Sequence, residues 1–538
     1  MYMDHRSSMA AAEGVGLLLL LLFLAGAISI FWLSPVRRRR RLRQNGFDGP
    51  PPVFPLGNLM EMSEKGGERG PPARPPSPDD GADDGGSISH DIHSYVFPYF
   101  HRWSKTYGKV FVYWLGTEPF LYVADPEFLR QITAGAMSKK WGKPNVFKLD
   151  RKPMFGNGLV MVDGDDWTRH RHIISPAFSA TNLDRMVSLM EETTEKLLRE
   201  WSARVAMGRP EMDIEKDITD NAAEIIAKAS FGMSDEKGKK VFEKLRRMQK
   251  MLFQTHRLVG VPFGNLLIAA KSYAAWRLGK EIDRLIYAIV DARKREKSQN
   301  DGRKDLLGLL LEQDQRELTT RELVDECKTF FFGGHETTAL ALAWTMLLLA
   351  LHPEWQAALR EEVMDVIGET GAAALDSAVL SKLTKMGWVW NEVLRLYSPS
   401  PNAQRQAREE VRVGEVVIPE GTNMWVDVVG MHHDTALWGE DANEFRPERW
   451  SGEAAAAAER GGCRHRMGFL PFGFGGRICV GRNLTAMEFK IVLCLVLRRF
   501  SWSVSPEYSH SPRIMLSLRP SNGIRLILRS LSEEESRK

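Results

Sequence analysis

The pattern of hydrophobic and polar positions divides the chain into three parts. Residues 15–33 form a run of 19 residues without a charged side chain, which is the length that a helix needs to cross a bilayer. Residues 63–89 are rich in Gly, Pro and Asp and almost free of large apolar side chains, a composition typical of a disordered insertion. From His90 onward, apolar residues recur as they do in a globular domain.

The periodicity of this body is mostly that of helices. Two short apolar runs at 110–115 and 120–123, separated by Gly116 and Pro119, predict a β-hairpin. Helices are expected over 182–201, 214–230, 238–257, 273–297 and 318–351, and further strands over 411–418, 514–518 and 524–528. The sequence therefore predicts a mainly α fold with a minor β region.

Charge places the apolar run relative to the body. Residues 37–41 and 43 are all arginines, and the positive-inside rule places everything after them in the cytosol, with a short lumenal N-terminus. A cleaved signal peptide is the alternative, because Ala25-Gly26-Ala27 resembles a cleavage site. The apolar run continues past that site to Leu33, which favours a retained single-pass transmembrane anchor.

Overall composition excludes several classes of protein. The net charge of +4 over 538 residues gives no reason to expect a nucleic-acid partner. Four cysteines without regular spacing argue against a disulfide scaffold and for a reducing compartment.

One of these cysteines, Cys479, lies among glycines in the stretch Phe-Gly-Phe-Gly-Gly-Arg-Ile-Cys-Val-Gly at 472–481. Glycine lets a backbone approach a flat group closely, and a thiolate is a good axial ligand for haem iron. Arg477 is placed to pair with an acidic group such as a haem propionate. A Gly-rich turn beside an ordinary buried cysteine is the alternative for a lone cysteine, and the four fixed positions Phe472, Gly475, Arg477 and Gly481 argue against it.

The stretch resembles the signature F-x-x-G-x-R-x-C-x-G of the cytochrome P-450 superfamily, matched at every specified position. The resemblance implies the mostly α fold of that superfamily, haem b (iron protoporphyrin IX) as cofactor and Cys479 as the iron ligand. It divides the chain into a membrane anchor over 1–36, a basic, Pro-rich and disordered linker over 37–89, and a haem-thiolate catalytic domain over 90–538.

A second constellation, Gly-Gly-His-Glu-Thr-Thr at 333–338, is expected to interrupt the long apolar helix over 318–351. Poor helix formers inside a strong helix often mark a functional site, although a plain helix kink is the alternative. It matches the superfamily motif [AG]-G-x-[DE]-T-T, which implies that the two glycines open a groove, Thr337 binds a distal oxygen and Glu336 links it to a proton source. His335 fills the variable position and is not expected to be a ligand.

Two further motifs complete the resemblance. Glu392 and Arg395 share a helix face in an E-x-x-R spacing, which alone is usually a surface pair. Arg449 matches the third partner of that pair in the superfamily, with Trp450 in place of the commoner Phe, and the trio is expected to be structural. Trp167 and Arg171 match W-x-x-x-R, for which a surface basic cluster is the alternative. The match implies that Trp167 and Arg171 bind a haem propionate. Arg405 matches another propionate-binding arginine of the superfamily.

The resemblance implies a monooxygenase that inserts one oxygen atom from O2 into a C–H bond of a hydrophobic small molecule. Electrons would come from NADPH through a separate NADPH–cytochrome reductase, and the anchor would lie in the endoplasmic reticulum membrane. Several stretches look like the plant clan that modifies cytokinins, gibberellins, brassinosteroids and fatty acids. A reductase-independent isomerase or dehydratase and a non-enzymatic haem sensor or carrier are the alternatives.

Contacts for substrate and reductase are also expected. Substrate contacts are expected from the segment before Trp167, from 252–278, from Ala339 and Ala343, and from 398–403. An acidic reductase is expected to dock on basic residues near the cysteine loop, namely Arg464, His465, Arg466 and Arg482.

Overall fold

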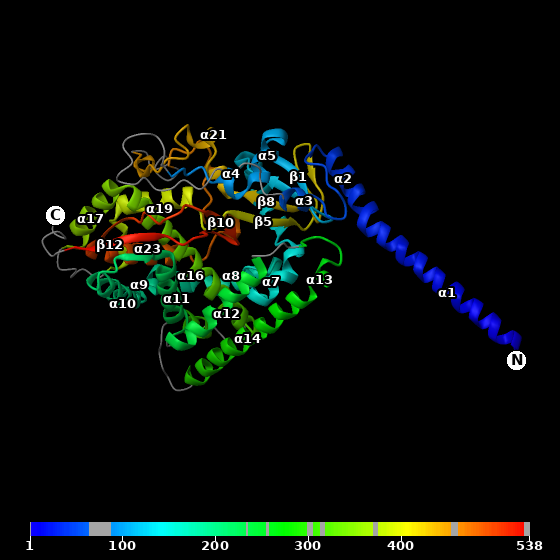
Figure 1. Ribbon diagram of the computed structural model, residues 1–538, viewed down its shortest axis with the longest axis horizontal. Helices are drawn as coiled ribbons and strands as arrows, with labels where there is room; N and C mark the ends of the chain where they lie inside the picture. The colour runs from blue at the N-terminus through cyan, green and yellow to red at the C-terminus, as the bar shows by residue number, and fades with distance from the viewer. Residues whose placement is uncertain are drawn as a thin grey trace.

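The computed structural model describes residues 2–63, 88–232, 235–253, 258–297, 305–312, 318–368, 375–452 and 461–531. The insertion predicted over 63–89 therefore lies, apart from its ends, outside the described residues. Within the described ranges the chain is mainly helical with a minor β portion (Figure 1). The predicted fold class is confirmed.

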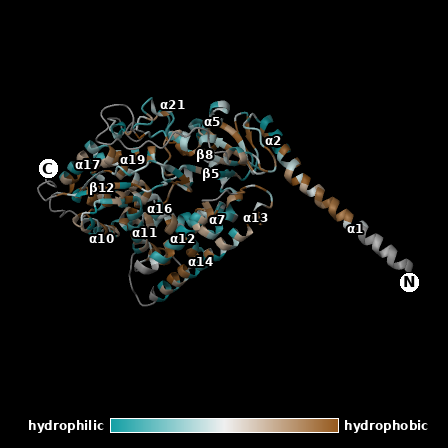
Figure 2. Cartoon of the chain, in the orientation of Figure 1, coloured by the Kyte–Doolittle hydropathy of each residue, from teal (hydrophilic) through white to brown (hydrophobic). Residues whose placement is uncertain are grey.

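The N-terminal segment is one long helical rod that projects away from the body (Figure 1). It comprises α1 (Tyr2–Ile28), a π-helical turn η1 (Ser29–Leu33) and α2 (Ser34–Gln44). Its leucine-rich part is exposed and strongly hydrophobic (Figure 2), and the helix Gly14–Gln44 is long and apolar enough to span a membrane. The arginine run lies on α2, which touches the body where Arg41 donates to Glu410 at 3.0 Å and Leu42 is buried.

A five-stranded sheet lies at the end of the body from which the rod projects (Figure 1). Its order is β1-β2-β8-β5-β3, with β2 and β8 parallel and the other neighbours antiparallel. The predicted hairpin is its β1–β2 pair. The strands of this sheet are β1 (Val110–Leu115), β2 (Glu118–Val123), β3 (Trp141–Gly142), β5 (Asn402–Ala407) and β8 (Asn423–Asp427).

The smaller sheets hold the predicted C-terminal strands. A three-stranded sheet has the order β4-β12-β9, and two hairpins stand alone. The segment 514–518, predicted as one strand, instead turns between two strands at Leu516, whose φ is +72°. The strands are β4 (Glu211–Asp213), β6 (Val411–Val413), β7 (Val416–Ile418), β9 (Phe500–Val504), β10 (Pro512–Met515), β11 (Ser517–Pro520) and β12 (Arg525–Ser530).

Helices make up the rest of the body. The predicted helix over 182–201 is in fact split into α9 and α10 by a turn at Arg185 and Met186, and the others begin and end within a few residues of expectation. The longer ones are α5 (Pro98–Tyr107), α6 (Pro126–Thr133), α7 (Lys148–Phe155), α8 (Gly164–Ile174), α10 (Val187–Ala206), α11 (Ile214–Phe231), α12 (Asp235–Phe253), α14 (Ala269–Lys297), α15 (Leu306–Glu312), α16 (Thr320–Leu351), α17 (Pro353–Ile367), α19 (Thr384–Leu396) and α23 (Arg482–Arg499). The shorter ones are α3 (Leu59–Ser63), α4 (His93–Val96), α9 (Ala180–Asp184), α13 (Gly264–Leu267), α18 (Ser377–Ser381), α20 (Val428–His432) and α21 (Thr435–Trp438).

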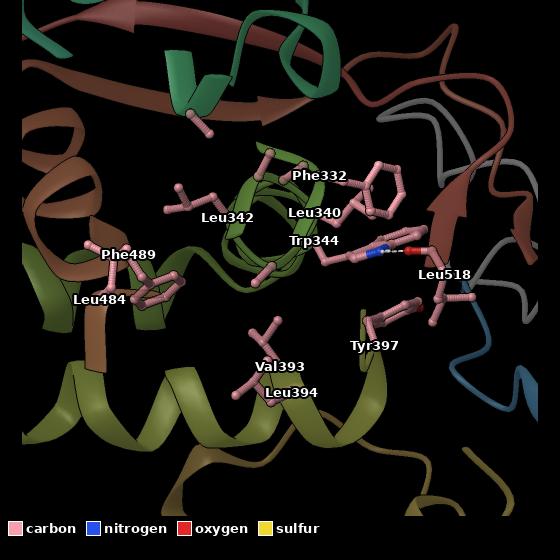
Figure 3. Close-up of a cluster of buried hydrophobic side chains, with 14 of the residues drawn as sticks. Phe332, Leu340, Leu342, Trp344, Val393, Leu394, Tyr397, Leu484, Phe489 and Leu518 are labelled. Carbon is pink, nitrogen blue, oxygen red and sulfur yellow. Dashed lines mark hydrogen bonds between the residues drawn. The ribbon is translucent and has the colours of Figure 1, made fainter. Parts of the chain in front are cut away.

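Helix α16 is the centre of the core. A capping box between Thr319 and Glu322 begins it, which satisfies N–H groups that the first turn leaves free. Leucine, valine, phenylalanine and tyrosine side chains surround it, and Trp344 of α16 donates from its indole to Leu518 O at 3.2 Å (Figure 3). The helix Thr320–Leu351 is also long and apolar enough to span a membrane, but 78% of its most apolar 18-residue stretch is buried inside the protein. It is therefore a core helix.

The interruption expected in α16 is absent, because the helix is continuous through 333–338. The hydroxyls of Thr337 and Thr338 donate to the carbonyl oxygens four residues earlier, at 2.8 and 3.0 Å. Packing of the apolar turns on both sides overrides the poor helix propensity of the motif.

Candidate active site

The cysteine loop at 472–481 precedes α23 and presents its thiol to a cavity. The Cys479 N–H donates to Phe472 O at 2.9 Å, which closes the loop on itself. Gly473 and Gly475 have φ values of +77° and +64°, in the left-handed region that only glycine adopts without strain. The sequence therefore requires glycine at the two points where this loop bends.

Two opposing effects act on the Cys479 thiol. Enclosure raises its pKa and outweighs the backbone N–H groups of Gly481 and Arg482 and the guanidinium groups of Arg171 and Arg482, which lower it. N–H groups at the start of a helix and nearby cations stabilise a thiolate. Of the four cysteines, the other three are buried in the core, so Cys479 is the one that can bind a cofactor.

The cavity has a volume of about 1010 Å³ and lies between the cysteine loop and α16. Gly333, Glu336 and Thr337 line its α16 side, and a Cβ at Gly333 would meet nothing within 4 Å. Gly334 also lines it, but a Cβ there would meet Ile226 of α11 at 2.6 Å. Gly333 thus opens the groove, whereas Gly334 lets two helices pack closely.

Most of the remaining cavity wall is apolar. It includes residues from the segment before Trp167, from 252–278 and from 398–403, as expected. Ala339 and Ala343 do not line it, contrary to expectation, because they point into the core and Ala341 takes that place. The apolar lining includes Phe147, Phe155, Leu159, Val160, Phe253, Leu258, Val259, Phe332, Leu394, Ile514, Met515 and Leu516.

The residues predicted to hold propionates gather at one end of the cavity. Arg171 of α8 donates to Ile478 O in the cysteine loop at 2.8 Å. The Arg477 guanidinium lies over the Trp167 ring at 4.8 Å and donates to Asp163 at 2.9 Å. The Arg405 guanidinium lies over the Phe474 ring at 5.0 Å. All four predicted side chains line the cavity.

Two cations at this cavity, Lys143 and Arg151, were not predicted as binding residues. Burial and the neighbouring Arg405 and Arg477 lower the pKa of Lys143 well below its usual value. Asp163 was missed as well, and it accepts from Arg477, Lys148 and Arg408. Basic residues before Trp167 carry no local sequence signal that they line a binding cavity. Arg151 of α7, for example, meets Gln404 of β5 only in the folded chain.

This donor set fits a haem. The cavity has a thiol on one wall and a group of cations beside it, and among the described residues only Asp163 offsets them. Buried cations without counter-ions are costly, and two haem propionates supply the missing negative charge. Trp167, Arg171, Arg405 and Arg477 would hold those propionates, and Cys479 would bind the iron.

Glu336 and Thr337 differ in orientation. The Thr337 hydroxyl donates to Gly333 O and lies on the cavity wall. The Glu336 carboxylate is buried and accepts hydrogen bonds from Gln249 Nε2 at 2.6 Å and from Ser517, and the Arg519 guanidinium is 3.6 Å away. The acid is thus held between α12 and β11, at the edge of the cavity.

His335 is directed away from the cavity, as expected for a non-ligand. Its Nδ1 lies 2.5 Å from Phe331 O and its ring packs against Phe242 at 4.7 Å.

The E-x-x-R trio forms an ionic cluster in which Glu392 and Arg395 are fully buried. Glu392 accepts from Arg395 at 2.7 and 2.9 Å and from Arg449 at 2.9 Å, and the Trp450 indole donates to it at 3.0 Å. Arg395 also donates to the carbonyl oxygens of His432, Ala442 and Glu444. The cluster joins α19 to the chain around 432–450, and none of its three residues lines the cavity.

Comparison with known proteins agrees with this geometry. The family model Cytochrome P450 matches residues 88–528. A cytokinin hydroxylase of Arabidopsis thaliana is 36% identical over 520 residues, which cover 94% of this chain and 95% of the relative. Cytochrome P450 714D1 of Oryza sativa subsp. japonica is 36% identical over 541 residues (95% and 93%), and Cytochrome P450 734A1 of Arabidopsis thaliana is 32% identical over 530 residues (96% of each).

The match and the relatives, together with the thiol, the cation group and the cavity, support a monooxygenase with a haem-iron cofactor. The chain belongs to the cytochrome P450 family.

Proposed function

We propose that the protein hydroxylates a hydrophobic small molecule, of hormone-like, isoprenoid or fatty-acid type, with electrons from NADPH through a separate reductase. The observation that carries the proposal is the single cavity that joins Cys479 to Thr337 and is otherwise mostly apolar. A thiolate-ligated haem b, once bound, supplies dioxygen activation and transfer of one oxygen atom. The names of relatives such as cytokinin hydroxylase are consistent with a small-molecule substrate.

The chain's own residues organise that chemistry. Apolar side chains exclude water and hold the substrate by its hydrocarbon surface. The Thr337 hydroxyl lies at the open groove beside Gly333, where it would hold a proton at the cavity wall opposite the cysteine loop. Glu336, next to it in sequence, can receive protons through the Ser517 hydroxyl, and the Arg519 guanidinium favours its charged form.

The proposed location is the endoplasmic reticulum membrane, with the catalytic domain in the cytosol. The exposed apolar helix and the arginines that follow it support this placement. The reductase would dock near the cysteine loop, where Arg464, Arg466 and Arg482 are exposed. His465 instead pairs with Glu127 at 3.1 Å.

The experiment that tests the proposal is turnover in microsomes with reductase and NADPH, against a panel of plant hormones, isoprenoids and fatty acids. Hydroxylated product that depends on NADPH and O2 supports it. Conversion of a hydroperoxide without NADPH would instead identify an isomerase or dehydratase. A protein that binds haem but forms no product with or without NADPH would be a sensor or carrier.

Thr337→Ala is expected to uncouple NADPH oxidation from product formation, with roughly a 10-fold or greater loss of product per NADPH, in the range typical of lost proton transfer. Thr338→Ala is the matched control. Both hydroxyls donate to a carbonyl four residues earlier, but Thr338 faces Thr485 and is 1% exposed. Equal coupling in the two variants would contradict a role for Thr337 in proton delivery.

A further inference from the structure

Arg151 of α7 is a cavity residue whose charge is not offset by the protein. Its Nη2 donates to Gln404 Oε1 at 3.0 Å and its guanidinium lies over the Phe147 ring at 4.3 Å. Its Nε is buried and has no hydrogen-bond partner within the described ranges. No described carboxylate pairs with it, and burial alone lowers its pKa, to about 10, so the side chain is charged at neutral pH.

A buried charge without a counter-ion is strongly destabilising, and such a group is retained where a ligand supplies the opposite charge. Three cavity cations, Lys143, Arg151 and Arg405, form no direct ion pair with a carboxylate among the described residues, and Asp163 acts from a distance on Lys143 and Arg405 but not on Arg151. The haem brings two carboxylates. Arg405 lies against Phe474 of the cysteine loop, and the charges of Arg405 and Arg477 act on Lys143 more strongly than the charge of Arg151 does. These two cations belong to the propionate end, which leaves Arg151.

The hydrogen bonds of Arg151 run along β5, through Gln404 to Asn402, and do not reach the cysteine loop. Gln404, its acceptor, donates from Nε2 to Asn402 Oδ1 at 2.9 Å. Arg151, Gln404 and Asn402 line the cavity together, and they form one polar spot beside the apolar side chains of Phe155 and Phe332. A few convergent polar groups in an apolar pocket fix the orientation of a ligand.

We propose that the substrate is a hydrophobic carboxylic acid whose carboxylate is bound by Arg151. The inference rests on the proposed function, because it names the chemical class of molecule that the same cavity takes. A guanidinium binds a carboxylate through two parallel N–H groups, and Arg151 lines the cavity with only its Nη2 engaged, on Gln404. Gln404 holds the guanidinium in place, and the hydrocarbon part of the acid lies along the apolar wall.

The test compares carboxylic acids with their methyl esters. Dodecanoic acid, abietic acid and a bile acid, each with its ester, are titrated into the purified holoenzyme, and affinity is measured from the change in the Soret band. At least one acid is expected to bind more tightly than its ester in the wild type. Arg151→Met should weaken the binding of that acid by roughly 10- to 100-fold and leave the affinity for the ester unchanged. Arg151→Lys should restore part of the difference in affinity between acid and ester.

Lys152→Met is the matched control, because Lys152 is the neighbouring exposed cation of the same helix. This substitution should leave the affinity for the acid unchanged. A panel in which no acid is preferred over its ester overturns the proposal, as does equal loss in the Lys152 variant. Loss of haem from Arg151→Met with retention in Lys152→Met would assign Arg151 to a propionate and also overturns it. The proposed function fails separately, if the wild type hydroxylates no member of the wider panel.

Discussion

Replacing Cys479 with alanine is expected to abolish monooxygenase turnover and to remove the red-shifted Soret band of the reduced CO complex. Cys479 is the sulfur that opens on the cavity, and the N–H groups of Gly481 and Arg482 favour its thiolate form. A thiolate donates electron density to the iron and favours O–O cleavage, which a methyl group cannot do. Absorption spectroscopy of the reduced CO complex, with NADPH-dependent turnover, measures the effect.

Cys494→Ala provides the matched control. Cys494 is fully buried in α23, the helix that follows the cysteine loop, and it does not line the cavity. Its removal costs some packing but should leave the CO spectrum and turnover intact. A Cys479→Ala protein that kept both would show that another group binds the iron.

The parts of the site that could be predicted from sequence are those encoded within one loop or helix. The cysteine loop needs glycine where φ is positive, a cysteine for the metal and an arginine nearby, and all of these fall within ten residues. The same holds for the pair Glu392 and Arg395, which share a helix face. Local spacing specifies such groups before the chain folds.

The parts that could not be predicted depend on contacts between distant segments. Arg151 reaches Gln404 across 253 positions of sequence, and Glu336 is held by Gln249 and Ser517 from two other elements. The turn at Leu516 was missed because leucine carries no turn signal there, unlike Gly or Asn. Continuity of α16 through its glycines likewise follows from packing rather than from helix propensity.

Glu392→Gln is expected to lower the free energy of unfolding by about 3–5 kcal/mol, the range for removing one partner of a buried ion pair. The carboxylate receives hydrogen bonds from two guanidinium groups, the Trp450 indole and the Arg446 N–H. A neutral amide leaves Arg395, which is 0% exposed, without a counter-charge. The measurement is the apparent midpoint of unfolding, together with the haem content of the purified protein.

The chain offers a matched control in a second E-x-x-R pair, Glu127 and Arg130 of α6, which is exposed on both sides. Glu127→Gln should cost no more than about 1 kcal/mol, as is usual for surface pairs. Equal destabilisation by the two substitutions would show that burial of the Glu392 cluster does not matter.

Acid pH provides an independent check on the Glu392 cluster. Burial alone would raise the pKa of Glu392, but the Arg395 guanidinium overrides it and the pKa is lowered. A carboxylate with a lowered folded-state pKa stabilises the fold above its unfolded pKa, about 4.3, and loses that contribution as pH falls toward the folded value. The stability gap between wild type and Glu392→Gln should therefore be full at pH 7 and narrow only below about pH 4.3. A gap that instead widened on acidification would mean that Glu392 is protonated in the native cluster, and its hydrogen bonds from two arginines argue against that.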